Sequence, residues 1–298
     1  MQECDWKQER KYCSRLGLAL ALVMLWALAW QFGLALIDQL LPAPMPDGVY
    51  YVLVLVGHYA VSLPAAYALC RSVPRLPFCR ETPAPRRMGR WLVIGLSMMF
   101  FGSLLGTAAN NLAYRLSGRE PVDLVEQAMG QLSPGVVLLV ACIIGPVCEE
   151  LLFRGLLAGR LARYGQKPGA LVSALLFGLF HANLEQFFYA FLLGLLLAYA
   201  YYRTGSLGAP IVLHMLYNLI GSGIPVLLVP TVGMALLYSV AWIAVAITGL
   251  VLLVRGRKAG VWLHGPCPPS MGAVFGNAGM LFAVVICFVQ LAVNFVLV

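Results

Sequence analysis

The order of apolar and polar positions along the chain predicts a series of helices that cross a membrane. A helix needs about 20 apolar residues to span the hydrocarbon core, and shorter stretches form re-entrant or interfacial segments. Nine stretches follow this pattern: 16–40, 49–70, 91–112, 132–160, 168–182, 186–202, 208–228, 231–254 and 278–298. The fifth is short and the fourth is long, so eight spans with one re-entrant segment fit almost as well. We therefore expect an all-α, polytopic transmembrane bundle with eight or nine spans.

The composition agrees with a transmembrane bundle and argues against a soluble or nucleic-acid-binding protein. The chain is 61% hydrophobic and 11% charged, whereas a soluble domain carries about 25% charged residues. Its net charge is +8, but the basic residues lie beside the spans, where they serve topology and contact lipid headgroups. We therefore expect the lipid bilayer and no nucleic acid as a partner. The eight cysteines form no CxxC or CxxH pair, which predicts neither a disulfide framework nor a metal cluster.

Lysine and arginine residues gather at the ends of alternate spans. They are Lys7, Arg10, Lys11 and Arg15, then Arg71, Arg75, Arg80, Arg86, Arg87 and Arg90, then Arg160, Arg163 and Lys167, then Arg203, and finally Arg255, Arg257 and Lys258. If the N terminus is inside, all of these residues lie on the cytoplasmic side, as the positive-inside rule requires. We therefore expect an integral membrane protein with a cytoplasmic N terminus.

Two further patterns concern how the spans meet lipid and each other. Trp91, Tyr201 and Tyr202 lie where an aromatic belt at the inner membrane surface is expected. Gly102 and Gly106 lie one helical turn apart, and small residues at this spacing let two helices approach closely.

Ionisable side chains inside the membrane are the strongest functional signal in the sequence. They are rare and costly at membrane depth, so each is a candidate for a functional site. They occur at four places: Glu149 and Glu150 with Arg154, His181 alone, His214 with Asn218, and His58 alone. We expect His58 to be a packed, structural residue and the other three places to form one site.

The depths of these residues suggest that three helices bring polar groups to one level. At about 1.5 Å per helical residue from the cytoplasmic end, Glu149 lies about 16 Å deep and His181 about 20 Å deep. By the same rise, His214 lies about 10 Å deep and Asn218 about 16 Å deep. A chance scatter of polar residues would not be expected to converge in this way.

Residue spacing predicts which side chains share a helix face. Glu150 and Arg154 are four residues apart, so they can form an ion pair. Glu149 points about 100° away from Glu150, given 3.6 residues per turn. One glutamate can therefore be held by arginine while the other faces a cavity. Pro146 removes a backbone hydrogen bond one turn earlier, which predicts a kink beside the glutamates.

These groups suit the hydrolysis of an amide. A carboxylate in a low-dielectric site is a better base towards water, and a neighbouring histidine can orient that water or move a proton. A second histidine with an asparagine offers N–H donors to the oxyanion that forms on the attacked carbonyl. This arrangement needs no serine or cysteine nucleophile.

Other interpretations of the same residues stay open at this point. Glu149, His181 and His214 could bind zinc, although the HExxH spacing is absent. The glutamates could also relay protons in a transporter. The chain could be a non-catalytic partner protein, in which the polar groups only hold helices together by an ion pair and interhelical hydrogen bonds.

Three short motifs in this order resemble the CPBP family of intramembrane proteases. EExxxR corresponds to Glu149–Arg154, FxxxH to Phe177–His181, and HxxxN to His214–Asn218. The family includes the type II CAAX prenyl endopeptidases and the bacterial Abi, or bacteriocin self-immunity, proteins. The resemblance covers residues 132–228, and it divides the chain into N-terminal spans at 1–131, a catalytic core at 132–228 and C-terminal spans at 229–298.

The resemblance implies a glutamate-dependent endopeptidase without a metal or other cofactor, in a bacterial inner membrane. It assigns the water-activating base to Glu149, assisted by His181, and the oxyanion hole to His214 and Asn218. Glu150 completes the catalytic group, and Arg154 and Phe177 are support residues. The implied substrate is a membrane-associated protein or peptide. Nothing in the sequence identifies a pocket for a prenyl group.

Overall fold

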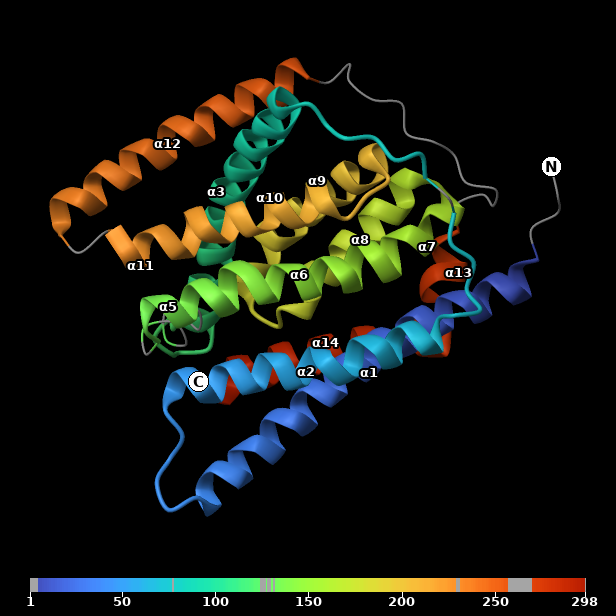
Figure 1. Cartoon of the computed structure of the whole chain (residues 1–298), viewed down its shortest axis with the longest axis horizontal. Coiled ribbons are helices and arrows are strands. Elements are labelled where there is room, and N and C mark those ends of the chain that lie inside the picture. Colours follow the sequence, from blue (N-terminus) through green and yellow to red (C-terminus); the bar gives the residue numbers. More distant parts are fainter. Residues whose placement is uncertain are drawn as a thin grey trace.

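The fold follows from a computed structural model that describes residues 5–76, 78–123, 127, 130, 132–228, 231–256 and 270–297. These residues form helices and no strand (Figure 1). The helices are α1 (Trp6–Leu40), α2 (Asp47–Leu69), α3 (Pro85–Leu116), α5 (Pro134–Val137), α6 (Gly145–Glu150), α7 (Gly159–Leu161), α8 (Gln166–Phe180), α9 (Leu184–Thr204), α10 (Gly208–Asn218), α11 (Ile224–Leu228), α12 (Val232–Arg255), α13 (Met271–Phe275) and α14 (Ala278–Leu297). The predicted all-α class is confirmed.

Eight of the described helical segments are long and apolar enough to cross a membrane. They are Trp6–Leu40, Asp47–Leu69, Pro85–Leu116, Pro134–Tyr164, Leu184–Thr204, Gly208–Leu227, Val232–Arg255 and Ala278–Val296. The predicted fifth span corresponds to α8, which has 15 residues and is therefore only about 22 Å long. The described residues thus contain eight candidate spans and one short apolar helix, as expected for an integral membrane protein.

The fourth span, Pro134–Tyr164, changes its helical geometry twice. The π-helical segments Leu138–Ile144 and Leu151–Ala158 lie on either side of α6, which carries the two glutamates. The sequence predicted a kink at Pro146. The irregularity instead takes the form of wider helical turns, in which the Gly145 N–H donates to the Val140 carbonyl five residues earlier. Such turns are rare and occur frequently at functional sites.

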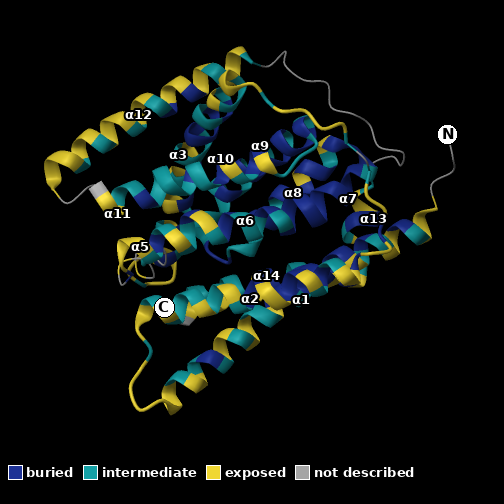
Figure 2. Ribbon diagram, in the orientation of Figure 1, coloured by how far each residue is buried: buried dark blue, intermediate teal, exposed yellow. Residues whose placement is uncertain are grey.

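The helices differ in how much of their surface other helices cover. In Figure 1, α1, α2 and α14 lie together on one side of the fourth span, while α3 and α12 lie on the other. The most apolar window of Leu184–Thr204 is 44% buried and that of Val232–Arg255 is 11% buried. Figure 2 shows the same contrast between the dark core around α8 and α9 and the largely exposed α12. The span with the two glutamates, Pro134–Tyr164, is 39% buried by the same measure and thus among the more covered ones.

Contacts between helix ends agree with the predicted alternation of the spans. Arg163, at the end of the fourth span, forms an ion pair with Glu9 near the start of α1. At the opposite ends, Arg119 after α3 donates to the Phe295 carbonyl near the end of α14. Arg257 and Lys258, which also served to predict the orientation, lie outside the described residues. That the face with Glu9 is cytoplasmic stays a prediction.

The aromatic residues assigned to an inner belt do not lie against lipid. Trp91, Tyr201 and Tyr202 are 6%, 0% and 5% exposed. The Tyr202 hydroxyl donates to the Ala158 carbonyl at 2.8 Å, so this side chain faces another helix. The belt prediction is wrong for these three residues, because their rings pack between helices near the membrane surface and do not point outwards.

Two glycines let α3 and α9 pack closely, as the sequence predicted. A Cβ atom at Gly102 would lie 2.5 Å from the Tyr189 Cα, and one at Gly106 would collide with the Glu185 carbonyl oxygen. Real Cβ atoms do not approach so closely, so any larger residue at these positions must separate the two helices. The contact thereby fixes α9, which follows His181 directly in the chain.

We expect Gly106→Leu to destabilise the protein by roughly 1–3 kcal/mol, the usual cost of overpacking a close contact. Gly89→Leu is the matched control, because it lies on the same helix and no heavy atom lies within 4 Å of its Cβ position. Thermal unfolding of both variants in detergent measures the difference. Equal midpoints for the two variants would contradict the tight α3–α9 approach.

Candidate active site

Helix α6 holds the two adjacent glutamates in different surroundings. The Glu150 side chain is 0% exposed, whereas that of Glu149 is 19% exposed. This difference follows from the helical geometry, because neighbouring residues point about 100° apart. The structure thus places one carboxylate inside the protein and leaves the other within reach of water.

One oxygen of Glu150 accepts two hydrogen bonds from two helices. Arg154 Nη1 donates to Glu150 Oε1 at 2.7 Å, and His214 Nδ1 lies 2.8 Å from the same oxygen. The other Arg154 amino group donates to the Gly194 carbonyl at 3.2 Å. Arg154 is also fully buried. A buried ion pair is stable only with good geometry and further hydrogen bonds. Glu150 Oε1 and both amino groups of Arg154 meet this condition, whereas Glu150 Oε2 and Arg154 Nε are buried without a hydrogen-bond partner in the described parts of the chain.

The hydrogen bond to Glu150 determines which ring nitrogen of His214 carries a hydrogen. The carboxylate oxygen accepts from Arg154, so it acts as an acceptor towards His214 Nδ1 as well. His214 Nε2 then faces Glu149 Oε2 at 3.8 Å. This second nitrogen can donate a hydrogen bond only when the ring is protonated, and it accepts one when the ring is neutral.

Phe177 lies between the remaining members of the group. Its ring centroid lies 4.9 Å from that of His181 and 5.7 Å from that of His214, and both pairs are close to perpendicular. The Arg154 guanidinium carbon lies 4.5 Å from the same centroid. Phe177 therefore joins side chains from all three sequence motifs, as a buried aromatic spacer.

His181 has a fixed ring orientation. Its Nδ1 lies 2.8 Å from the Phe177 carbonyl oxygen, and a carbonyl can only accept, so Nδ1 carries the hydrogen. Nε2 of the neutral ring then has a free lone pair, which can accept a hydrogen bond or a proton.

The turn after His181 is held from two sides. Ala182 has a φ of 47°, a left-handed conformation that costs a non-glycine residue on the order of 1 kcal/mol. Asn294 of α14 donates to the Ala182 carbonyl at 3.0 Å. Asn183 caps α9, because its side chain accepts from the Glu185 N–H at 2.9 Å. The end of α8, and with it His181, therefore has a defined position.

Asn218 contacts the fourth span on the other side of the glutamates. Its Nδ2 donates to the Ala141 carbonyl at 2.8 Å, in the first π-helical segment. A primary amide carries two N–H donors, and this bond uses one of them. Residue 218 itself precedes a further π-helical segment, Leu219–Gly223.

Three supporting residues were not found from the sequence. Their hydroxyl groups donate to carbonyls of the second π-helical segment at 2.8, 3.0 and 2.8 Å: Tyr67 to Leu151, Ser173 to Phe153, and Tyr202 to Ala158. Carbonyls that a regular helix would pair internally need such donors inside a membrane. The only sequence signal for these residues is a hydroxyl group within an apolar span, and it names no partner.

His58 lies apart from the group. It is 9% exposed and stacks on Tyr59, with ring centroids 4.1 Å apart. Tyr59 in turn lies near enough to Glu149 for an electrostatic interaction between the two side chains. The structure therefore links α2 to the site through Tyr59, which the sequence did not single out.

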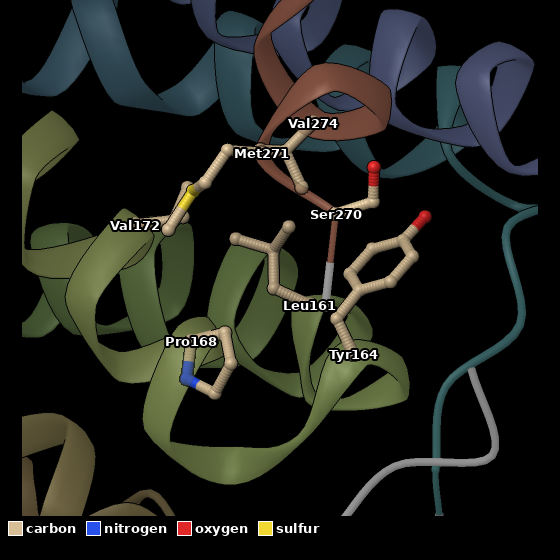
Figure 3. A pocket seen from close by; sticks show the side chains of 8 residues that line it. Leu161, Tyr164, Pro168, Val172, Ser270, Met271 and Val274 are labelled. Atoms are coloured by element: carbon tan, nitrogen blue, oxygen red, sulfur yellow. The ribbon is translucent and has the colours of Figure 1, made fainter. Parts of the chain in front are cut away.

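The described residues contain no group of three or more His, Cys, Asp or Glu side chains that could hold a metal ion. Glu149, His181 and His214 are therefore not placed as a ligand set in this structure. A small pocket lies elsewhere, between the ends of α7 and α8 and helix α13 (Figure 3). None of its lining residues, which include Leu161, Tyr164 and Met271, belongs to the candidate site.

Comparisons with known proteins relate the segment that carries the candidate site to membrane proteases. Residues 131–220 match the family model described as type II CAAX prenyl endopeptidase Rce1-like. The resemblance that the three motifs predicted is therefore confirmed over this segment, and at the level of the family it supports a membrane protease.

Two curated proteins are similar to part of the chain. A Bacillus subtilis (strain 168) protein named "Putative membrane peptidase YdiL" is 27% identical over 43% of this chain and 52% of its own length. An "Uncharacterized 24.3 kDa protein" of Escherichia coli is 29% identical over 46% of this chain and 61% of its own length. The chain thus spans about half the length of the curated relatives it matches. No solved structure matches the chain.

The buried ion pair can be tested by a double-mutant cycle. We expect Arg154→Met alone to destabilise the protein by about 3–5 kcal/mol, because it leaves Glu150 as an uncompensated buried charge. Adding Glu150→Gln should recover part of this loss, since no unpaired charge then remains. Unfolding midpoints in detergent report both effects.

Arg87→Met serves as the control, because its pair with Glu81 is exposed, at 32% and 53% of the two side chains. It should leave the midpoint unchanged, since exposed pairs contribute little. A double variant no more stable than Arg154→Met would show that the two side chains are not coupled.

Proposed function

We propose that the chain is an intramembrane endopeptidase that hydrolyses a peptide bond with a water molecule activated by Glu149. The observation that carries this proposal is the unequal environment of the two glutamates. Glu150 is fully buried and contacts Arg154 and His214. Glu149 is partly exposed and faces the other ring nitrogen of His214. A structural ion pair needs only one carboxylate, so the second is available for chemistry.

In this mechanism Glu149 takes a proton from the water as the oxygen attacks the scissile carbonyl carbon. The Nε2 lone pair of His181 accepts a hydrogen bond from the same water and orients it. The proton held by Glu149 then passes to the leaving amine as the C–N bond breaks. The products are a carboxylic acid and an amine, and the site returns to its starting state.

The developing oxyanion needs N–H donors on the opposite side of the carbonyl. The second N–H of Asn218 and the Nε2–H of a protonated His214 can supply them. Glu150 is then the counter-ion of that imidazolium as well as of Arg154. Two carboxylates, one guanidinium and one imidazolium sum to zero charge, which suits a site inside a membrane.

The proposal also covers the setting of the reaction. We place the N terminus in the cytoplasm and the chain in a bacterial inner membrane, and we assign the catalytic core to residues 132–228. The substrate is a membrane-associated protein or peptide that enters from the bilayer. A zinc hydrolase or a proton-relay transporter would use the same carboxylates, and the following experiment separates these functions.

We expect Glu149→Gln to lower peptide-bond hydrolysis by about 10²–10⁴-fold, the usual contribution of a general base. Wild type and variant, both purified in detergent with EDTA, are incubated with a cellular membrane fraction, and the released peptides are compared by mass spectrometry. Glu81→Gln is the control, because that carboxylate is exposed and lies outside the spans.

Identical peptide sets from wild type and Glu149→Gln would overturn the proposed mechanism. Loss of wild-type cleavage in EDTA, with recovery on adding zinc, would favour the metal-dependent alternative. If Glu149→Gln, His181→Ala and His214→Ala all left a cellular phenotype intact, the non-catalytic function would gain support.

The oxyanion assignment predicts a distinct kinetic effect. On a peptide identified in that comparison, Asn218→Ala should lower kcat by about 10²–10³-fold, because the lost donor acts mainly on the transition state. KM should change little. Asn111→Ala on α3 is the control, and an effect confined to KM would assign Asn218 to substrate binding instead.

A further inference from the structure

A cluster of three arginines lies where the start of α1, the end of α2 and the end of the fourth span meet. We call Arg15, Arg75 and Arg160 the arginine cluster. Arg160 is 9% exposed, whereas Arg15 and Arg75 are exposed. None of the three arginines belongs to the three motifs, and the proposed hydrolysis does not use them.

The hydrogen bonds of Arg160 go to backbone carbonyls and to no anion. Its Nε donates to the Val73 carbonyl and its Nη1 to the Leu156 carbonyl, each at 3.2 Å. Its guanidinium carbon lies 5.8 Å from the centre of the Tyr67 ring. These contacts fix the group in place, but they leave its full positive charge.

The surroundings of Arg160 add positive charge and remove none. The ionisable groups close to it are Cys70, Tyr67, Tyr201 and Arg75, of which only Arg75 is charged at neutral pH and none is a carboxylate. Glu81, Glu150 and Glu9 pair with other arginines, namely Arg87, Arg154 and Arg163. A buried arginine and an exposed one therefore lie side by side without a counter-ion from the described parts of the chain.

The magnitudes favour an anion from outside the described residues. An ion removed from water costs several kcal/mol unless an opposite charge compensates it. The carbonyls at a helix C terminus attract a cation by about 0.3–1 kcal/mol, or about 2 kcal/mol when partly buried. Helix ends alone are therefore too weak to balance Arg160 and its neighbours.

The exposed members are held in position around Arg160. Arg75 Nη2 donates to the Tyr201 hydroxyl at 2.6 Å. A Cβ atom at position 159 would lie 3.1 Å from Arg75 Nε and 2.9 Å from the Tyr201 hydroxyl, so Gly159 gives Arg75 its place against the helix. Arg15 donates to the Ser72 hydroxyl.

We propose that the arginine cluster binds the phosphate group of an anionic phospholipid. Planar guanidinium groups match phosphate oxygens well and are weakly hydrated, so arginine binds such groups at partly buried sites. The cluster lies at the end of a membrane span, where basic side chains meet the lipid headgroups. Anionic headgroups at that surface attract basic segments of membrane proteins.

The bound phosphate would connect residues inside the family-matched segment with residues before it. Arg15 and Arg75 precede the segment that matches the protease family, and Arg160 lies within it. One lipid headgroup would thus fasten α1 and the segment after α2 to the family-matched core. Free inorganic phosphate offers the same chemistry, so the test must separate the two sources.

The test is native mass spectrometry of the purified full-length protein released from detergent with defined lipids. Wild type should retain phosphatidylglycerol at least about fivefold more than phosphatidylcholine, since a 1 kcal/mol preference corresponds to this ratio. Arg75→Gln should lose the preference, whereas Arg86→Gln should keep it. Arg86 is the matched control, because it is exposed in the following segment and changes the net charge equally.

Arg75→Lys keeps the positive charge but lacks the planar guanidinium group, so it should retain an intermediate preference for phosphatidylglycerol. Equal retention of both lipids by wild type would overturn the proposal. So would an equal loss in the Arg75→Gln and Arg86→Gln variants, because that result would indicate only general surface charge. Thermal stabilisation of wild type by inorganic phosphate, without any phosphatidylglycerol preference, would assign the cluster to free phosphate and also overturn it. Lipid retention and thermal stabilisation are measured without proteolysis, so failure of this proposal is distinguishable from failure of the proposed function.

Discussion

The buried contact of Glu150 with Arg154 and His214 is the interaction on which the rest of the site depends. It joins the fourth span to α10 through a single carboxylate oxygen, 2.7 Å from Arg154 Nη1 and 2.8 Å from His214 Nδ1. Removing Glu150 would leave the buried Arg154 without a carboxylate, and removing Arg154 would leave the Glu150 carboxylate without its guanidinium; either loss costs more than the pair itself stabilises. Because Glu150 is committed to this contact, the proposed mechanism assigns the chemistry to the adjacent Glu149.

The same constraint accounts for the unusual backbone around the glutamates. The π-helical segments on both sides of α6 change the pairing of backbone carbonyls, and these must find other donors inside the membrane. Tyr67, Ser173 and Tyr202 supply hydroxyl groups to the second segment, and Asn218 supplies an amide to the first. The polar residues of the core thus serve two purposes: some carry the proposed chemistry, and others stabilise the backbone that presents it.

Much of the fold and part of the site could be predicted from the sequence, because some relations are fixed within one helix. Apolar length predicted the spans, and the spacing of four residues predicted the Glu150–Arg154 pair. Contacts between helices are different, since they depend on packing that no local pattern encodes. The carbonyl partner of Tyr67 and the burial of Tyr201 and Tyr202 are of this kind. The contact of His214 with Glu150 is intermediate: motif order predicted that they meet, but not which glutamate binds the ring.

The most direct test of the account is an experimental structure of the Glu149→Gln variant with an uncleaved peptide bound. The account predicts that the scissile carbonyl oxygen points towards Asn218 and His214, and that its carbon faces a water molecule between the side chain at position 149 and His181. Glu150 should keep its contacts with Arg154 and His214. A peptide bound with its carbonyl groups away from both histidines, or a Glu150 carboxylate that contacts the substrate itself, would contradict the division of roles between the two glutamates.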